Sequence, residues 1–348
     1  MLVCLLILLA CGAVKTLFKR GMRFRSVRVR AKGRGRVTTV RTAVTTTDEA
    51  QRSADATGLP RALMRAGGLM PAVLVVLGVV GWLCWRVLVS RHHVLDTWVV
   101  WTFDVLFVIV AVQLVVAGFE GRVVGRGETY RVAVLVPLYN EDPDVVVRML
   151  SALLHQSSPP AEIHVVDDGS TQGAYLEERD WFIRQAAMAR IYATWQRTAN
   201  EGKRHAQIHG FRKIRDADLF VTVDSDSMLD AEALHEIVQP FSDPRVMSVA
   251  GVILAINNRE NLLARVTDVI FVGQQLIDRS FMSRLGSVMV NSGGLAAYRR
   301  SILADNIDIY THESYLRRHV EFSDDSLLTL FALLRGRTCL LYTSPSPR

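Results

Sequence analysis

The sequence predicts an α/β domain with a mostly parallel sheet flanked by helices, preceded by a transmembrane helix hairpin. Three observations support this prediction. Two apolar runs follow one another before residue 120. Beyond Arg131, short β-branched runs alternate with amphipathic segments, a pattern typical of parallel strands joined by helices. Acidic residues directly follow two of the predicted strands, where open α/β sheets bind their ligands.

The predicted hairpin consists of Leu69–Val89 and Trp98–Phe119. Each run reaches roughly the 20 residues that a membrane-spanning helix requires. The second run contains Asp104 and Gln113, which would be costly against lipid and are expected to face a neighbouring helix or a polar path. Two long buried helices of a soluble protein are the alternative interpretation.

Charge indicates the orientation of the hairpin. The segment from Lys15 to Arg41 is rich in Lys and Arg, contains no Asp or Glu, and supplies much of the net charge of +7. Such basic segments mark the cytoplasmic side of a membrane, and the short connector Ser90–Leu95 returns the chain to that side. We therefore expect a multi-pass plasma-membrane protein whose domain after Phe119 is cytoplasmic. The basic segment is expected to contact membrane lipid and not nucleic acid, with RNA binding as the alternative.

The predicted domain begins with a clear strand and helix. Val132–Val136 has the composition of a buried strand, and Asp142 followed by Pro143 is typical of a helix start. Ile163–Val166 and Leu219–Val223 are two further predicted strands. The four cysteines lack metal-ligand spacing and imply no disulfide framework.

Acidic clusters follow these two strands. In an extended segment, Asp224 and Asp226 would point to the same side, which suits a Mg²⁺ or Mn²⁺ ion shared with a phosphate. A solvated Asp-rich turn is the alternative. Asp167 and Asp168 could accept hydrogen bonds from a base or ribose, while Gly169 would let the backbone approach closely. A capped turn into the next helix explains the same residues equally well.

A basic cluster, Gly202-Lys203-Arg204-His205, stands at the predicted start of another helix. A diphosphate bound there would meet side-chain cations and free backbone N–H groups. On these residues alone, a solvated basic helix start is at least as good an interpretation.

The order and spacing of these pieces resemble a known family. Ala133–Arg337 is similar to the catalytic domain of family 2 glycosyltransferases, and in particular to bacterial hyaluronan synthases. The matching segments are Tyr139-Asn140-Glu141, Val166–Ser170, Gly202–Gln207 (GKRHAQ), Val223–Ser227 (VDSDS), Asn257–Asp268 (NNRENLLARVTD), Ser292–Arg299 (SGGLAAYR) and Ser323-Asp324-Asp325. The GKRHAQ and NLLARVTD strings are far more specific than D-x-D, which many nucleotide-sugar enzymes share.

The resemblance implies a nucleotide-sugar fold of the GT-A type that takes UDP-sugars as donors. Its implied substrate-binding residues are Tyr139 and Asp168 for uridine, Lys203 for the diphosphate, Glu141, Asp167 and Arg204 beside them, and Ser292, Gly293 and Gly294 facing the acceptor. Asp224 and Asp226 would hold the metal ion.

The resemblance also implies the chemistry. Asp325 is the candidate general base that takes a proton from the acceptor hydroxyl, with Asp324 as its neighbour. Adjacent carboxylates can raise one another's pKa, which suits a base that works near neutral pH. Attack from the face opposite UDP would invert the anomeric carbon and give a β-linkage. The metal ion would stabilise the leaving diphosphate, so no covalent sugar–enzyme intermediate is needed.

Two segments depart from the hyaluronan synthase pattern. Ser323–Ser326 stands where those enzymes carry Gly-Asp-Asp-Arg, and Ser292–Gly294 stands where they carry Ser-Gly-Pro. The leading expectation is a processive, hyaluronan synthase-like β-glycan polymerase that uses UDP-GlcNAc, with UDP-GlcA as a second donor, and extends a polysaccharide. A chitin-oligosaccharide or other β-glycan synthase, a non-processive transferase to a lipid acceptor, and a catalytically inactive membrane scaffold stay open.

The ends of the chain complete the expected organisation. Met1–Phe18 is apolar but shorter than a span, and Cys339–Arg348 (CLLYTSPSPR) resembles translated sequencing adapter. We therefore expect the natural chain to continue past Thr338 and the 348-residue polypeptide to be inactive. The expected parts are 1–68, an apolar stretch and basic segment; 69–119, two transmembrane helices; 120–338, an incomplete cytoplasmic glycosyltransferase domain; and 339–348, a non-native tail.

Overall fold

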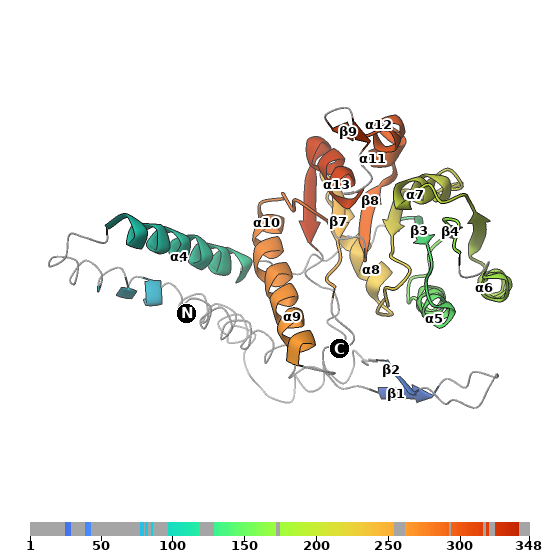
Figure 1. Cartoon of the computed structure of the whole chain (residues 1–348), viewed down its shortest axis with the longest axis horizontal. Helices are drawn as coiled ribbons and strands as arrows, with labels where there is room; N and C mark the ends of the chain where they lie inside the picture. The colour runs from blue at the N-terminus through green and yellow to red at the C-terminus, as the bar shows by residue number, and fades with distance from the viewer. Residues whose placement is uncertain are drawn as a thin grey trace. The chain divides into compact units, whose positions relative to one another are not determined.

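The computed structural model describes residues 25–28, 39–42, 77–79, 81–82, 85, 97–118, 129–171, 175–253, 262–291, 294–315, 318–319 and 324–340. The chain divides into two compact units (Figure 1). One comprises Met1–Glu120, Leu254–Arg284 and Ser346–Arg348, and the other comprises Gly121–Ile253 and Leu285–Pro345. The predicted catalytic residues all belong to the second unit.

A seven-stranded sheet forms the centre of the second unit, in the order β11-β7-β8-β6-β3-β4-β5. Its strands are β3 (Val132–Leu138), β4 (Glu162–Asp167), β5 (Tyr192–Arg197), β6 (Leu219–Thr222), β7 (Val246–Ala250), β8 (Ala296–Arg299) and β11 (Arg337–Leu340). Neighbouring strands pair in parallel, except where β8 runs antiparallel to β6 and β7. The predicted mostly parallel sheet is therefore confirmed.

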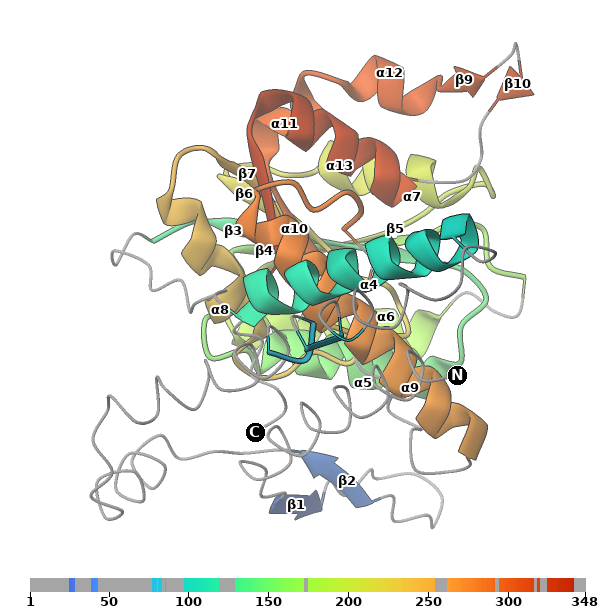
Figure 2. The ribbon, with the colours of Figure 1, turned by 90° about the vertical axis from the view of Figure 1, so that its left-hand side faces the viewer.

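Helices cover both faces of this sheet. On one face lie α5 (Pro143–Leu154), α6 (Leu176–Met188) and α8 (Ala233–Val238), the last continued by the short η2 (Gln239–Ser242). On the other lie α7 (Lys203–Phe211), α11 (Arg300–Ala304), α12 (Ile307–Thr311) and α13 (Asp324–Arg335). Both views of the molecule show this division (Figures 1 and 2). The strand pair β9 (Ser314–Tyr315) and β10 (Arg318–His319) follows α12.

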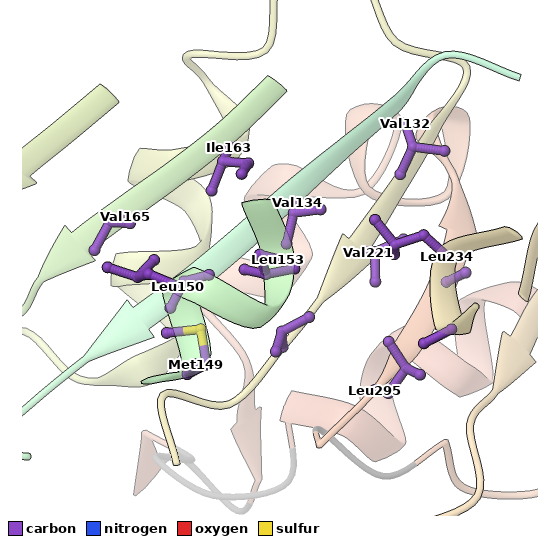
Figure 3. Packing of buried hydrophobic residues seen from close by; sticks show 14 of the residues in the cluster. Val132, Val134, Met149, Leu150, Leu153, Ile163, Val165, Val221, Leu234 and Leu295 are labelled. Atoms are coloured by element: carbon purple, nitrogen blue, oxygen red, sulfur yellow. The ribbon is translucent and has the colours of Figure 1, made fainter. Parts of the chain in front are cut away.

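The central strand β3 explains why the sheet needs two helical layers. Successive side chains of a strand point to opposite faces, so Val132 and Val134 join the core under α5, α6 and α8, whereas Ala133 and Leu135 join the core under α7 and α11–α13. Figure 3 shows the first of these cores. Full burial of each large aliphatic side chain contributes about 1.5–3 kcal/mol. A strand that is apolar at every position therefore has to be covered on both sides.

Helix α5 begins where the sequence predicts. Asp142 is its N-cap and accepts a hydrogen bond from the backbone N–H of Asp144 at 2.8 Å. Pro143 occupies the first helical position, where its missing N–H costs nothing. This start turns the chain away from the carboxyl end of β3 and leaves Tyr139 and Glu141 at the edge of the sheet.

The first unit contains helix α4 (Thr97–Gly118), the pair β1 (Arg25–Arg28) and β2 (Thr39–Thr42), and the consecutive segments α9 (Leu262–Gly273), π-helical η3 (Gln274–Arg279) and α10 (Ser280–Arg284). α4 packs against η3 and α10. Asp104, a polar residue in the second predicted span, is buried and accepts a hydrogen bond from Trp82 Nε1 at 3.0 Å. Its carboxylate thus meets a neighbouring segment.

The part of the chain that the structure describes contains no helix with the length and apolar character needed to cross a membrane. The first predicted span, Leu69–Val89, lies mostly outside the described residues, as do Met1–Phe18 and everything after Leu340.

Candidate active site

The acidic clusters lie at one edge of the sheet, as predicted. β4 and β6 both pair in parallel with β3, so their carboxyl ends meet at the same edge. β4 ends at Asp167 and β6 ends just before the cluster that begins with Asp224. The loop in front of α7 approaches this edge from β5.

Lys203 connects the predicted metal, diphosphate and base positions. Its Nζ lies 2.8 Å from Asp224 Oδ1 and 3.7 Å from Asp324 Oδ2. Burial alone would lower the pKa of Lys203, but the carboxylates of Asp224, Asp325 and Asp324 outweigh burial and raise it. The ammonium therefore keeps its charge throughout the physiological range. Three segments far apart in the sequence meet at this one side chain.

The segment from Asp224 to Ser227 forms a turn, so the expected extended arrangement was wrong. The backbone N–H of Ser227 donates to the carbonyl of Asp224 at 3.0 Å. The register of β6 with β3 and β8 ends at Thr222, and the last backbone bond to β3 is donated by the N–H of Val223 to the carbonyl of Leu135 at 3.1 Å. Asp224 is half-buried and Asp226 is exposed. The two carboxylates are therefore placed by a turn that projects from the sheet edge.

Asp167 and Asp168 organise the loops around the site. Asp167 is buried and accepts the backbone N–H of Ser170 at 2.9 Å, which closes a turn after β4; the next helix, α6, begins only at Leu176 and is not capped by this turn. Asp168 accepts the backbone N–H groups of Glu201 and Gly202 at 3.0 and 2.8 Å. Asp168 thus holds the loop that places Lys203 at the start of α7. Its contact with uridine stays a prediction.

Two glycines make this loop arrangement possible. Gly169 has φ +73°, and a Cβ there would lie 2.7 Å from the backbone nitrogen of Asn200. Gly169 thus lets the backbone approach the loop after β5 closely, while its predicted approach to a bound nucleoside stays a prediction. Gly202 has φ +94° and ψ 159°, a conformation open in practice only to glycine.

Arg204 contacts other residues than Lys203 does. Its guanidinium is buried, lies 2.8 Å from Glu313 Oε2 and stacks on the ring of Tyr310. The hydroxyl of Tyr310 also donates to Gln207 Oε1. The residues of the GKRHAQ string therefore have two different roles. Lys203 faces the carboxylates, whereas Arg204 and Gln207 bind α7 to Glu313 and to Tyr310 of α12. Sequence reasoning missed Tyr310 and Glu313, because no motif marks them.

Tyr139 and Glu141 follow β3 at the same edge. Tyr139 is exposed, and the next residue, Asn140, adopts a left-handed conformation with φ +53°. Glu141 Oε1 accepts a hydrogen bond from Ser225 Oγ at 3.3 Å, which ties it to the Asp224–Ser227 turn. The hydroxyl of Tyr175, another residue that the motifs do not mark, donates to the carbonyl of Glu141 at 2.7 Å.

The predicted acceptor segment is described only in part. Ser292 and Gly293 lie outside the described residues. Gly294 is buried, and a Cβ there would meet Ile253 Cδ1 at 2.7 Å and Ser227 Oγ at 3.2 Å. The end of the predicted acceptor segment therefore lies close to Ser227, at the end of the turn that carries Asp224 and Asp226, and a larger residue there would have to displace neighbouring side chains.

Comparison with known proteins agrees with this geometry. The family model "Glycosyl transferase family 2" matches residues 133–306. The chain is 35% identical over 215 residues to the hyaluronan synthase of Streptococcus pyogenes, covering 62% of this chain and 51% of that protein. It is 32% identical over 228 residues to an N-acetylglucosaminyltransferase of Azorhizobium caulinodans, covering 64% of this chain and 54% of that one. The chain thus spans about half the length of these relatives.

A solved structure supports the fold. The mannosyltransferase PcManGT from Pyrobaculum calidifontis, in complex with GDP-Man and Mn²⁺, superposes with a TM-score of 0.51 at 20% sequence identity, covering 68% of this chain and 61% of the other. The GT-A type of α/β fold implied by the motifs is therefore confirmed. The match of the family model over residues 133–306, together with the relatives, establishes that this chain belongs to glycosyl transferase family 2.

Proposed function

We propose that this chain carries the catalytic part of an inverting, UDP-sugar-dependent glycosyltransferase, and that the whole protein is a membrane-bound, hyaluronan synthase-like β-glycan polymerase. One observation carries the proposal. The ammonium of Lys203 lies among Asp224, Asp324 and Asp325 at the edge where the carboxyl ends of the parallel strands meet. The similarity to hyaluronan synthase supports this choice of product class.

The donor would bind between the end of β3 and the start of α7. Exposed Tyr139 would stack on the uracil, and Asp168 would fix both the loop and the nucleoside. Lys203 would contact the diphosphate from the first position of α7, where free backbone N–H groups and the helix dipole also favour an anion. Arg204, already paired with Glu313, would serve this site by holding α7 in place.

A divalent cation fits these residues. Asp224 and Asp226 offer hard carboxylate oxygens, and a cationic group already lies 2.8 Å from Asp224. Among the described residues, no group of three or more His, Cys, Asp and Glu side chains could hold a metal ion alone. Mg²⁺ or Mn²⁺ commonly completes its coordination with substrate phosphates and water. When bound, such an ion would supply charge stabilisation for the leaving diphosphate.

The chain's own groups would then carry the transfer. Asp325, in the first turn of α13, would accept the proton of the acceptor hydroxyl, and Asp324 and Lys203 would keep the charges of the site balanced. The acceptor oxygen would attack the anomeric carbon opposite UDP, and the bond to UDP would break. A β-linkage and free UDP would result.

Membrane attachment is part of this proposal. The two apolar runs Leu69–Val89 and Trp98–Phe119 and the basic segment before them support a hairpin with a cytoplasmic catalytic domain. The hydrogen bond from Trp82 to Asp104 supports contact between the runs, since a polar residue within a span needs a partner.

The donor requirement tests the proposal. Full-length protein in membranes would be incubated with labelled UDP-GlcNAc, with and without UDP-GlcA. Polymer that depends on both donors supports a hyaluronan-like product. Polymer made from UDP-GlcNAc alone would instead support a chitin-like synthase, the second candidate, which the similarity to an N-acetylglucosaminyltransferase favours. A single sugar added to a lipid would identify a non-processive transferase.

A further inference from the structure

Thr329 joins two parts of the proposed site that are far apart in sequence. This buried residue lies one helical turn after Asp325 in α13. Its Oγ1 donates to the carbonyl of Asp325 at 2.6 Å and accepts the backbone N–H of Asn291 at 3.0 Å. One hydroxyl proton and its lone pairs suffice for both bonds. Asn291 is fully buried and directly precedes the acceptor segment Ser292–Gly294.

The surroundings of Thr329 are buried and partly polar. Tyr298, on β8, is fully buried and stacks on Phe220 with ring centroids 5.2 Å apart. Burial raises the pKa of Tyr298 strongly, the charge of Asp325 raises it further, and the side chains of Thr329 and Asn291 lower it. Tyr298, Asn291 and Thr329 therefore lie together beside Asp325 of the proposed site.

Of the two hydrogen bonds of the Thr329 hydroxyl, the one to Asp325 stays within α13, whereas the one from Asn291 comes from outside the helix. In an α-helix the carbonyl of Asp325 already accepts the backbone N–H of Thr329, so the hydroxyl adds a second donor there. That second bond orients the hydroxyl and leaves a lone pair for Asn291. Without the hydroxyl of Thr329, the buried backbone N–H of Asn291 would lose this acceptor, which is unfavourable.

We propose that Thr329 is a positioning residue that keeps Asn291, the residue before the predicted acceptor segment, in register with Asp325. The inference rests on the proposed function and deepens it. A general base works only within hydrogen-bond reach of the proton it removes. Thr329 fixes the backbone on both sides of that contact: the turn that carries Asp325 and the residue that precedes the acceptor segment.

The test compares Thr329→Val, which keeps the shape and removes the hydroxyl, with Thr329→Ser, which keeps the hydroxyl. Small displacements at a reacting centre cost up to about 100-fold in rate, so we expect the valine variant to lower kcat by about 10- to 100-fold. Its KM for the UDP-sugar and its affinity for UDP should stay within about twofold of wild type, because the donor side is untouched. Serine should restore most of kcat.

Thr311→Val is the matched control. Thr311 Oγ1 donates to the carbonyl four residues earlier, Ile307, at 2.6 Å, as Thr329 does to Asp325. Thr311→Val should keep the wild-type kcat, measured with full-length protein in the same membranes. If Thr329→Val does not accumulate, Thr329→Ala replaces it in the comparison with serine.

Several results would overturn the inference. Wild-type kcat in Thr329→Val would remove the positioning role while leaving the transferase proposal intact. If Thr329→Val lost UDP affinity together with kcat, or if Thr329→Ser failed to restore kcat, the fold would be generally damaged. Either result would also reject the positioning role of Thr329. If wild-type protein binds UDP but transfers no sugar from any UDP-sugar, the proposed function fails first, and the role of Thr329 fails with it.

Discussion

Asp325 is the residue on which the proposed chemistry depends most directly. Replacement by asparagine keeps the size of the side chain and removes its capacity to take a proton. General acid–base catalysis typically contributes about 10²- to 10⁴-fold, so we expect Asp325→Asn to lower kcat by at least about 100-fold with UDP affinity retained. The measurement is steady-state transfer in membranes, together with UDP binding.

Asp305→Asn provides the matched control, because Asp305 is an exposed residue of the same unit that pairs with Arg335. Wild-type rates in both variants would exclude Asp325 as the base. If the transferase activity of the membranes were also undiminished in Asp226→Asn, that activity would not come from this site, and the interpretation as a catalytically inactive scaffold would be favoured.

Lys203 carries a charge that the described structure places between Asp224, a proposed metal ligand, and Asp324, beside the proposed base. Its raised pKa means that, wherever its carboxylate partners are ionised, this ion cluster stabilises the folded state up to the ordinary lysine value of 10.5. That contribution is lost only as the pH rises further, through the folded pKa. Activity changes between about pH 5 and 9 therefore have to come from other groups.

Removal of this charge should weaken donor binding. A hydrogen bond to a charged group contributes about 1.5–3 kcal/mol, so Lys203→Met should lower the affinity for UDP by about 10- to 100-fold. Lys213→Met is the control, since Lys213 is exposed just after α7. Calorimetry of UDP binding gives the comparison, and equal affinities in the two variants would contradict the assigned contact.

At the scale of elements, α7 is positioned through the loop before it and through its buried face. Asp168 holds the loop before it, and Glu313 and Tyr310 hold its buried face through Arg204 and Gln207. The helix therefore presents Lys203 from a fixed position. The charge of Arg204 is also structural: a buried guanidinium needs a carboxylate partner, and its ion pair with Glu313 links α7 to the segment after α12.

This attachment can be tested with Glu313→Ala, which leaves Arg204 buried without its carboxylate. An unsatisfied buried group costs about 1–3 kcal/mol, so thermal unfolding should occur at a lower temperature, and KM for the UDP-sugar should rise. Glu177→Ala, at an exposed position of α6, should do neither. An unchanged unfolding midpoint in Glu313→Ala would show that the ion pair does not hold the helix.

The sequence predicts those elements whose signals are local. β3, β4 and β6 are apolar runs between turns, and the start of α5 has its capping residue and proline in place. β5 was not foreseen, because its half-buried residues alternate too weakly to stand out. The turn at Asp224 was only the alternative to an extended segment, since the point where β6 loses its neighbours is decided by the register of the sheet and not by the residues themselves.

The same distinction applies to the site. Lys203, Asp224, Asp324 and Asp325 come together as the motifs lead one to expect. The destination of Arg204 could not be foreseen, because its partner, Glu313, is more than a hundred residues away in the chain and belongs to no motif. Thr329 is hidden for the same reason: its contact with Asn291 exists only after folding.

For the whole molecule, the proposal requires a domain that becomes complete only with its ligands. The protein supplies two carboxylates on a turn and a lysine that links one of them, Asp224, to Asp324 beside the proposed base. The remaining coordination has to come from the nucleotide and water. Ligand that binds only the native state stabilises it by about 2.7 kcal/mol at a concentration 100 times Kd. Thermal stability therefore reports binding without depending on the acceptor.

We expect UDP together with Mg²⁺ or Mn²⁺ to raise the unfolding midpoint more than UDP alone, and EDTA to abolish the difference. Asp226→Asn should lose the increment that the metal adds and keep the smaller shift caused by UDP, because Lys203 and the start of α7 are unchanged. Asp308→Asn, an exposed carboxylate on α12, should keep both shifts. Equal midpoints with and without metal in the wild-type protein would reject the metal site, and a full metal increment in Asp226→Asn would place it elsewhere.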